Sequence, residues 1–431
     1  MPRSRMRSAA LLMAALLVMP GGNPIDATGL PTRYDDPDNQ LIDIHMSPRL
    51  RPGGLHLSYD AASRDEQSLL DVAGLLAADG KAIYHRDWSA DRERRLGPDF
   101  DATRCAACHV ETSPLADDWD ASPVFVVKAG DSDARRVYGE QVNTRHVAER
   151  LPEGRVTLRY DAREFIYADG SVVELRQPRA FAVGRQGETF EVELRIAPLL
   201  FGWGLLEQAS PDFLSSFDDP DDANRDGISG RLLRDAQGRI ARFGWKSSHV
   251  SLVDQVAAAL HNDMGIDSGA RCAHCDEEIS DGELAALVDY VRFLGVPDRR
   301  PGATQRGQDL FGVVGCSDCH VSVSLTGEHD DATFSRQVAW PFSNLAVHDM
   351  GADLASPSGA ADAREWRTAP LWGLGVVEQR FPERGFLHDG RARTIEEAIL
   401  WHGGESRTAR DRFSRLDLED RQALLRYVRS L

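Results

Sequence analysis

The chain has 431 residues, of which 42% are hydrophobic and 7% aromatic, as expected for a folded globular protein with two or three domains. Its formal net charge of −18 argues against a nucleic-acid partner, because a surface of this sign repels a polyanion.

The N-terminus has the pattern of a secretory signal. Three arginines, at positions 3, 5 and 7, precede an apolar run from Ala9 to Met19, and Pro20 ends that run. The run is too short to span a bilayer comfortably. We therefore expect residues 1–27 to be a signal peptide and the protein to be periplasmic or otherwise exported, with no stable membrane span after signal removal.

The spacing of apolar residues changes along the chain. Helical spacing at 64–79 gives way to alternation between about 122 and 200, where a turn at Asp169-Gly170 predicts a β-hairpin. Helical spacing then returns in three segments, at 251–260, 281–295 and 418–431. The stretch PDRRPG at 297–302 is typical of a linker.

Two short motifs carry the most specific chemistry, CAACH at 105–109 and CSDCH at 316–320. In Cys-x-x-Cys-His, two thiols bond to the two vinyl groups of one haem, and the histidine ligates its iron. The alternatives are a redox dithiol and half of a zinc site, but zinc would need two converging cysteine pairs. We therefore predict two covalently attached haem c groups. Cys105 and Cys108 would attach the first haem, with His109 as its axial ligand. Cys316 and Cys319 would attach the second, with His320 as its axial ligand.

The two motifs also suggest the fold. GKAIY at 80–84 and GQDLF at 307–311 form a weak internal repeat, each starting a short helix before its motif. We expect a mainly α protein of two cytochrome c-like haem domains, with a β-rich insertion in the first half. The N-terminal haem domain would span 60–298, with the insertion at about 122–200, and the C-terminal cytochrome c domain would span 302–431.

Two further patterns leave alternatives open. CAHC at 272–275 lacks a following histidine, so a disulfide between Cys272 and Cys275 is expected, with a third haem or a metal site as alternatives. A second pattern has oxygen ligands at alternate positions before a glycine, as in calcium loops, but its twelfth position is Leu233. The loop could hold one calcium ion or could be an acidic turn. Its candidate ligands are Asp222, Asn224 and Asp226.

A resemblance adds to these patterns. Residues 364–406, from REWRTAP to HGGES, closely resemble the di-haem oxidoreductase family, also called thiol oxidoreductase-like proteins. Supporting stretches lie at 218–231, 242–246, 262–266 and 344–351. More distantly the chain resembles bacterial di-haem cytochrome c peroxidases, and the di-haem enzymes that mature a tryptophan-derived quinone.

The resemblance implies a sixth ligand for the second haem. In the peroxidases, a His-Asp-Gly motif stands one helix before that ligand, and here the motif is at 388–390 and the following helix delivers His402. This implies His320/His402 ligation, with Met350 as the rival ligand. Candidates for propionate or haem-pocket contacts are His348, His388, Arg391, Arg393 and Trp245, and Trp245 is also a candidate electron relay.

We therefore expect an exported di-haem c-type oxidoreductase, peroxidase-like, with an electron-donor protein or a small redox substrate as its partner. The second haem would handle electrons, and the first would react with peroxide or another oxidant. The alternatives are a non-catalytic di-haem electron-transfer cytochrome and a protein-maturing di-haem oxidase. The sixth position of the first haem is left open or filled by one of His85, His146, His249, His261 and Met264.

Overall fold

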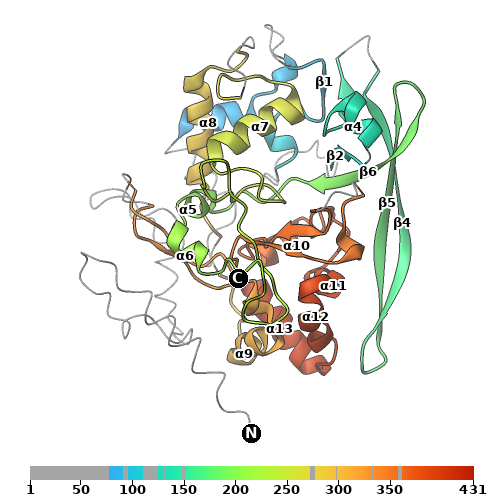
Figure 1. Ribbon diagram of the computed structural model, residues 1–431, viewed down its shortest axis with the longest axis vertical. Coiled ribbons are helices and arrows are strands. Elements are labelled where there is room, and N and C mark those ends of the chain that lie inside the picture. The colour runs from blue at the N-terminus through green and yellow to red at the C-terminus, as the bar shows by residue number, and fades with distance from the viewer. Residues whose placement is uncertain are drawn as a thin grey trace. The chain divides into compact units, whose positions relative to one another are not determined.

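The computed structural model describes residues 77–90, 96–109, 125–130, 132–147, 151–271, 277–297, 299–329, 331, 334–357 and 362–431 (Figure 1). All of them belong to one compact unit. The predicted signal peptide at 1–27 and the cysteines Cys272 and Cys275 lie outside the described residues. Within the described part of the chain, no helix has the length and apolar character needed to cross a membrane.

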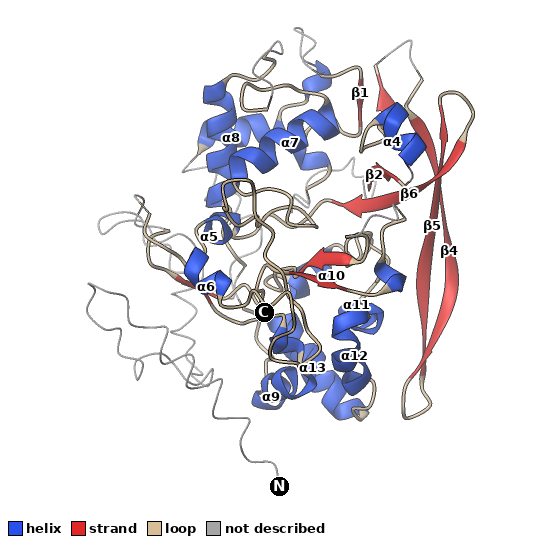
Figure 2. Ribbon diagram, viewed as in Figure 1, coloured by secondary structure: helices blue, strands red, loops and turns tan. Residues whose placement is uncertain are grey.

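Helices and strands are interleaved along the chain (Figure 2). The helices are α3 (Ala78–His85), α4 (Ser132–Tyr138), α5 (Trp203–Glu207), α6 (Pro211–Ser215), α7 (Leu252–Met264), α8 (Asp281–Phe293), α9 (Gln305–Val314), α10 (Leu374–Arg380), α11 (Ile395–Trp401), α12 (Arg407–Phe413) and α13 (Leu418–Ser430). The strands are β1 (Asp99–Phe100), β2 (Phe125–Ala129), β3 (Arg145–His146), β4 (Gly154–Ile166), β5 (Val172–Gly184), β6 (Thr189–Ile196), β7 (Ser324–Leu325), β8 (Val338–Ala339), β9 (Val347–Asp349) and β10 (Glu365–Arg367).

The expected fold class is wrong. Only 34% of the described residues are helical and 20% lie in strands, so the structure is not that of a mainly α protein of two cytochrome c-like domains. A four-stranded antiparallel sheet has the order β2-β6-β5-β4, and further short strands pair two by two. These short strands escaped sequence reasoning because two or three residues are too few to show a period of two. Contacts keep 42–431 in one unit, and the division into 60–298 and 302–431 stays a prediction.

Two helix crossings depend on glycine. α3 packs against α8 at Gly80, where a Cβ atom would stand 2.0 Å from the carbonyl oxygen of Ala286. α9 packs against α13 in the same way at Gly307, where a Cβ atom would stand 2.3 Å from the carbonyl oxygen of Ala423. Both distances are far below van der Waals contact, so only glycine lets the helix backbones approach this closely.

An aromatic pair one turn after each glycine extends the crossing. The ring centroids of Tyr84 and Tyr290 lie 5.1 Å apart, and those of Phe311 and Tyr427 lie 5.5 Å apart. Such pairs contribute about 0.5–1.5 kcal/mol beyond the apolar area that they bury. The internal repeat that the sequence indicated is therefore confirmed as a shared local arrangement, which leads in both cases to a Cys-x-x-Cys-His turn.

The longest strands form a hairpin that reaches the C-terminal helices (Figure 1). β4 pairs with β5 from Gly154 opposite Gly184 to Ile166 opposite Val172, and the predicted turn at Asp169-Gly170 is confirmed. At the tip, the hydroxyl of Tyr167 donates to Glu396 on α11 at 2.6 Å. Arg421 on α13 pairs with Asp169 at 2.7 Å. The β-rich insertion therefore braces the helices that surround the second motif.

Candidate functional site

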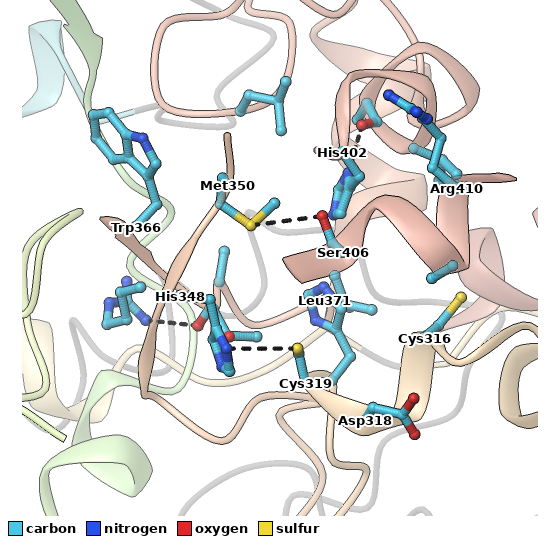
Figure 3. Close-up of a pocket in the computed structure, with 18 of the residues that line it drawn as sticks. Cys316, Asp318, Cys319, His348, Met350, Trp366, Leu371, His402, Ser406 and Arg410 are labelled. Carbon is cyan, nitrogen blue, oxygen red and sulfur yellow. Dashed lines mark hydrogen bonds between the residues drawn. The ribbon is translucent and has the colours of Figure 1, made fainter. Parts of the chain in front are cut away.

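The second Cys-x-x-Cys-His motif opens onto a cavity. α9 ends at Gly315, whose φ of +101° turns the chain out of the helix and into the turn that starts at Cys316. Cys316, Cys319 and His320 line a cavity of about 460 Å³, which we call the larger cavity (Figure 3). This volume lies within the range of roughly 300–1,000 Å³ that organic ligands and cofactors occupy.

The proposed axial histidines of the second haem line this cavity together. The Nδ1 atom of His320 lies 2.8 Å from the carbonyl oxygen of Phe342, and that of His402 lies 2.7 Å from the carbonyl oxygen of Ala398. A carbonyl only accepts, so each Nδ1 carries the proton and each Nε2 keeps its lone pair. Burial lowers the pKa of His320 to about 4 and also lowers the pKa of His402. Both imidazoles are therefore neutral, as iron ligands must be.

Met350 and His348 lie on the wall of the same cavity (Figure 3). The Sδ atom of Met350 accepts a long hydrogen bond of 3.8 Å from the hydroxyl of Ser406. Both nitrogens of His348 have partners, because Nδ1 lies 2.8 Å from a Glu405 carboxylate oxygen and Nε2 lies 3.2 Å from the amide nitrogen of Asn344. His348 is thus engaged in a buried polar network, while the Met350 thioether remains a possible donor to a metal.

The His-Asp-Gly motif forms a buried cluster beside the cavity. The imidazole of His388, which lines the larger cavity, stacks on the indole of Trp366 with ring centroids 3.6 Å apart. Burial lowers the pKa of His388 to about 4. Asp389 forms an ion pair of 2.8 Å with Arg391, and both side chains are almost fully buried. The motif therefore shapes the cavity wall.

The arginines that line the larger cavity differ from those suggested by the sequence. Arg391 is paired with Asp389, and Arg393 is paired with Glu397 at 2.7 Å. Neither of these two is among the residues lining the cavity, which include four other arginines: Arg367, Arg384, Arg410 and Arg412. Sequence reasoning missed these four, although Arg410 and Arg412 lie close after His402 and Arg367 lies within the block at 364–406.

The first motif has the same arrangement of donor atoms, but the cavity that it lines is smaller. The Nδ1 atom of His109 lies 3.1 Å from the carbonyl oxygen of Pro198, which leaves its Nε2 free to bind a metal. Burial lowers the pKa of His109 to about 4. Cys105, Cys108 and His109 line a cavity of about 60 Å³, which we call the smaller cavity. The donors fit a haem, but a group of that size requires the lining side chains to move apart.

The thiols of both motifs lack the lowered pKa that is typical of a redox dithiol. Burial raises the pKa of Cys105, Cys316 and Cys319 to about 12, and it raises the pKa of Cys108 as well. A redox dithiol needs a thiol with a lowered pKa, because the thiolate is the nucleophile. This disfavours the redox-dithiol alternative and is compatible with cysteines that attach a cofactor.

The smaller cavity narrows the choice of a sixth ligand for the first haem. Of the five candidates, Met264 at the end of α7 lines this cavity together with His109. His85, His146, His249 and His261 are not among its lining residues. His261 is instead paired with Asp267 at 2.6 Å.

A short segment forms a wall shared by the two cavities. Pro198, Leu199 and Trp203 line the larger cavity, and Trp203 also lines the smaller one. The carbonyl of Pro198 is the acceptor that fixes His109. Trp245, the relay candidate from the sequence, lines the larger cavity and donates from Nε1 to the carbonyl of Ile196 at 2.8 Å. Sequence reasoning missed Trp203, because no motif surrounds it.

The calcium candidates form a compact turn. Carboxylate and amide oxygens of Asp222 and Asn224 both accept from the backbone N–H of Asp226 at 2.9 Å. Asp226 also lines the larger cavity. In the part of the chain that the structure describes, no three acidic, histidine or cysteine side chains are grouped to hold a metal ion. The calcium ion stays a prediction.

The C-terminal region of the chain is similar to a known protein family. Residues 266–431 match the protein family described as "Di-haem oxidoreductase, putative peroxidase". Over these residues the chain is similar to the di-haem oxidoreductase family. The resemblance inferred from the sequence is thereby confirmed over these residues, and the family name implies two haems. Neither a search of curated proteins nor a search of solved structures found a match.

The di-haem oxidoreductase match covers the second motif, the His-Asp-Gly motif and His402. The first motif at 105–109 and the β4–β5 hairpin precede the matched residues. The assignment of the first haem therefore rests on its own Cys-x-x-Cys-His turn and on the Nδ1 contact of His109 with Pro198.

Proposed function

We propose that this protein is an exported di-haem c-type oxidoreductase, peroxidase-like, that uses one haem for electron transfer and the other for reaction with peroxide or another oxidant. The haems would be attached at 105–109 and 316–320, in line with the family that residues 266–431 match. Export is supported by the signal-like pattern at 1–27, because haem c attachment in bacteria follows export.

One observation carries the proposal: the two Cys-x-x-Cys-His turns face cavities that share Trp203. Electron transfer between two cofactors requires that they lie close together, and a shared wall meets that requirement. The same segment supplies the carbonyl of Pro198 that orients His109. Two haem sites built around one short segment are therefore suited to electron transfer between the haems.

The roles of the protein's own residues follow from their contacts. Bound haem would supply the redox chemistry, and the protein supplies ligands, orientation and a local field. His320 and His402 are both held by backbone carbonyls with Nε2 free, which suits a second haem with two protein ligands and an electron-transfer role. A partner protein or small molecule would supply the electrons.

Met264 favours a second candidate, a non-catalytic di-haem electron-transfer cytochrome. Its buried side chain lines the smaller cavity with His109, and a thioether in the sixth position of the first haem would occupy the place where an oxidant must bind. The two candidate functions predict opposite behaviour of Met264. In the enzyme an oxidant must displace it, and in the electron-transfer cytochrome it must stay bound.

Mass spectrometry and absorption spectra of the mature protein test both candidates. We expect the mass of two haems in the wild type and of one haem in a Cys316→Ala/Cys319→Ala variant. We also expect a spectral change on adding peroxide, which Cys105→Ala/Cys108→Ala abolishes. A protein without covalent haem would refute the proposal, and two haems that are inert to peroxide and cyanide would favour the electron carrier.

A further inference from the structure

Arg367 is a buried charge on the wall of the larger cavity. It ends β10, which pairs with β9 so that Arg367 stands opposite Val347. Its exposed fraction is only 7%. Burial lowers the pKa of its guanidinium to about 10, so the group remains positively charged at neutral pH. A charge this deeply buried normally needs a counter-charge beside it.

The protein gives Arg367 neutral acceptors. Its Nε donates to the carbonyl of Gly244 at 2.9 Å, and Nη1 donates weakly to the carbonyl of Thr368 at 3.4 Å. Among the described residues, no carboxylate oxygen lies within 4.0 Å of the guanidinium, and Nη2 has no partner. Arg391 and Arg393, the arginines suggested by the sequence, contrast with this, because each forms an ion pair with a carboxylate.

The position of Arg367 indicates where the counter-charge comes from. It lines the larger cavity together with Cys316, Cys319, His320 and His402, the residues expected to hold the second haem. A haem carries two propionate carboxylates, and a guanidinium is shaped to bind a carboxylate through two parallel hydrogen bonds. A ligand that brings its own carboxylate into this cavity would satisfy both the charge and the remaining N–H donors.

We propose that Arg367 binds a propionate of the second haem and sets the reduction potential of that haem. The proposal rests on the proposed function, because it takes the haem to be attached at 316–320. A fixed positive charge beside the haem favours the reduced iron, so Arg367 raises the midpoint potential. Arg391 and Arg393, suggested by the sequence, then serve to fix the His-Asp-Gly loop and α11 through their own ion pairs.

Spectroelectrochemistry on the fully loaded protein tests the proposal. We expect Arg367→Gln to lower the midpoint potential of the second haem, and Arg367→Lys, which keeps the charge, to lower it less. Arg429→Gln removes a positive charge on α13 from an ion pair with Glu378 and serves as the charge control. An unchanged potential in a fully loaded Arg367→Gln protein overturns the proposal.

A second measurement separates a propionate from a free anion. If a haem propionate is bound to the Arg367 guanidinium, adding acetate at constant ionic strength leaves the midpoint potential of the second haem unchanged in the wild type. An acetate-dependent potential that Arg367→Gln abolishes would show instead that a carboxylate from solution binds there, and would overturn the assignment to the haem. Should Arg367→Gln fail to load haem, the propionate bands in the resonance Raman spectrum of Arg367→Lys decide, since bands identical to wild type contradict the contact.

The experiment also distinguishes this proposal from the proposed function. Absence of covalent haem in the wild-type protein would refute the proposed function, and it would be seen by mass before any potential is measured. A protein with two haems and no effect of Arg367 would leave the proposed function intact and refute only the propionate contact.

Discussion

The imidazole of His402 donates from Nδ1 to the carbonyl oxygen of Ala398, one helical turn earlier, at 2.7 Å. This contact fixes the ring at the end of α11 and leaves Nε2 facing the larger cavity, where His320 also lies. His402 therefore meets the requirements for a sixth ligand better than a histidine whose two nitrogens are both occupied, such as His348.

We expect His402→Ala to convert the second haem from low-spin to high-spin, because the iron loses one of its two protein ligands. Electron paramagnetic resonance of the oxidised protein measures this directly. The matched variant is Met350→Ala, whose thioether lines the same cavity and which should leave the spin state unchanged. The opposite pattern, with only Met350→Ala giving a high-spin haem, would assign the ligand to the methionine.

Trp203 is the side chain that both cavities share, and it should matter for electron exchange between the haems. We expect Trp203→Phe to slow this exchange while both haems remain attached, because the ring that spans the shared wall becomes smaller. Flash-photolysis measurements of electron transfer between the haems report the rate. Trp245→Phe changes a residue on the larger cavity alone, so an equal effect of both variants would argue against a specific role for Trp203.

Gly307 should be intolerant of a side chain. In Gly307→Ala the new Cβ would stand 2.3 Å from the carbonyl oxygen of Ala423, so α9 and α13 must separate, at a cost of roughly 1–3 kcal/mol. Denaturant unfolding measures the change in the free energy of unfolding. Gly312→Ala, on the same helix, meets no atom within 4 Å and should stabilise the protein by roughly 0.4–1 kcal/mol. Equal effects of the two changes would contradict the close crossing.

A buried carboxyl near the first motif should make stability depend on pH. Burial raises the pKa of Asp101 from 3.8 to about 6, although it accepts hydrogen bonds from Thr144 and Gln141. The folded protein therefore binds this proton more tightly than the unfolded chain. The resulting stabilisation is fully present below pH 4 and is lost as the pH rises through 6, with a total on the order of 3 kcal/mol.

Melting temperatures between pH 4 and pH 7 check this effect in Asp101→Asn, where the contribution of this carboxyl to the pH dependence should vanish. The comparison is with Asp161→Asn, because Asp161 lies on the exposed β4–β5 hairpin and pairs with Arg179 at the surface. Parallel pH profiles for the wild type and Asp101→Asn would mean that Asp101 does not hold its proton in the folded state.

The sequence predicted which histidines line the two cavities better than it predicted the architecture around them. Spacing along the chain singled out His109 and His320, the resemblance singled out His402, and all three line the two cavities. The arginine contacts are different, because Arg367 reaches the larger cavity through the pairing of two three-residue strands. A strand of that length has no readable period, so sequence proximity pointed to Arg391 and Arg393, which are paired elsewhere.

The predicted fold class was wrong for a related reason. The alternation at 155–160 and 165–178 correctly predicted a hairpin, but its length and its contacts with α11 and α13 are tertiary properties. The helices around the second motif are short and separated by loops. The helical patterns at 251–260 and 418–431 did not indicate how much helix or strand the residues between them form. The result is a protein with substantial strand content, in which the insertion is part of the structure around the site.

The β4–β5 hairpin also affects the order in which contacts can form during folding. Tyr167 and Glu396 are 229 positions apart, so this contact at the tip of the hairpin cannot form until nearly the whole chain has been synthesised. Contacts of such long sequence separation form slowly, since the entropy of closing the intervening loop must be lost first. The second motif at 316–320 lies between these two partners, so if a haem is attached there, as we propose, we expect the attachment to precede the contact between the hairpin and α11.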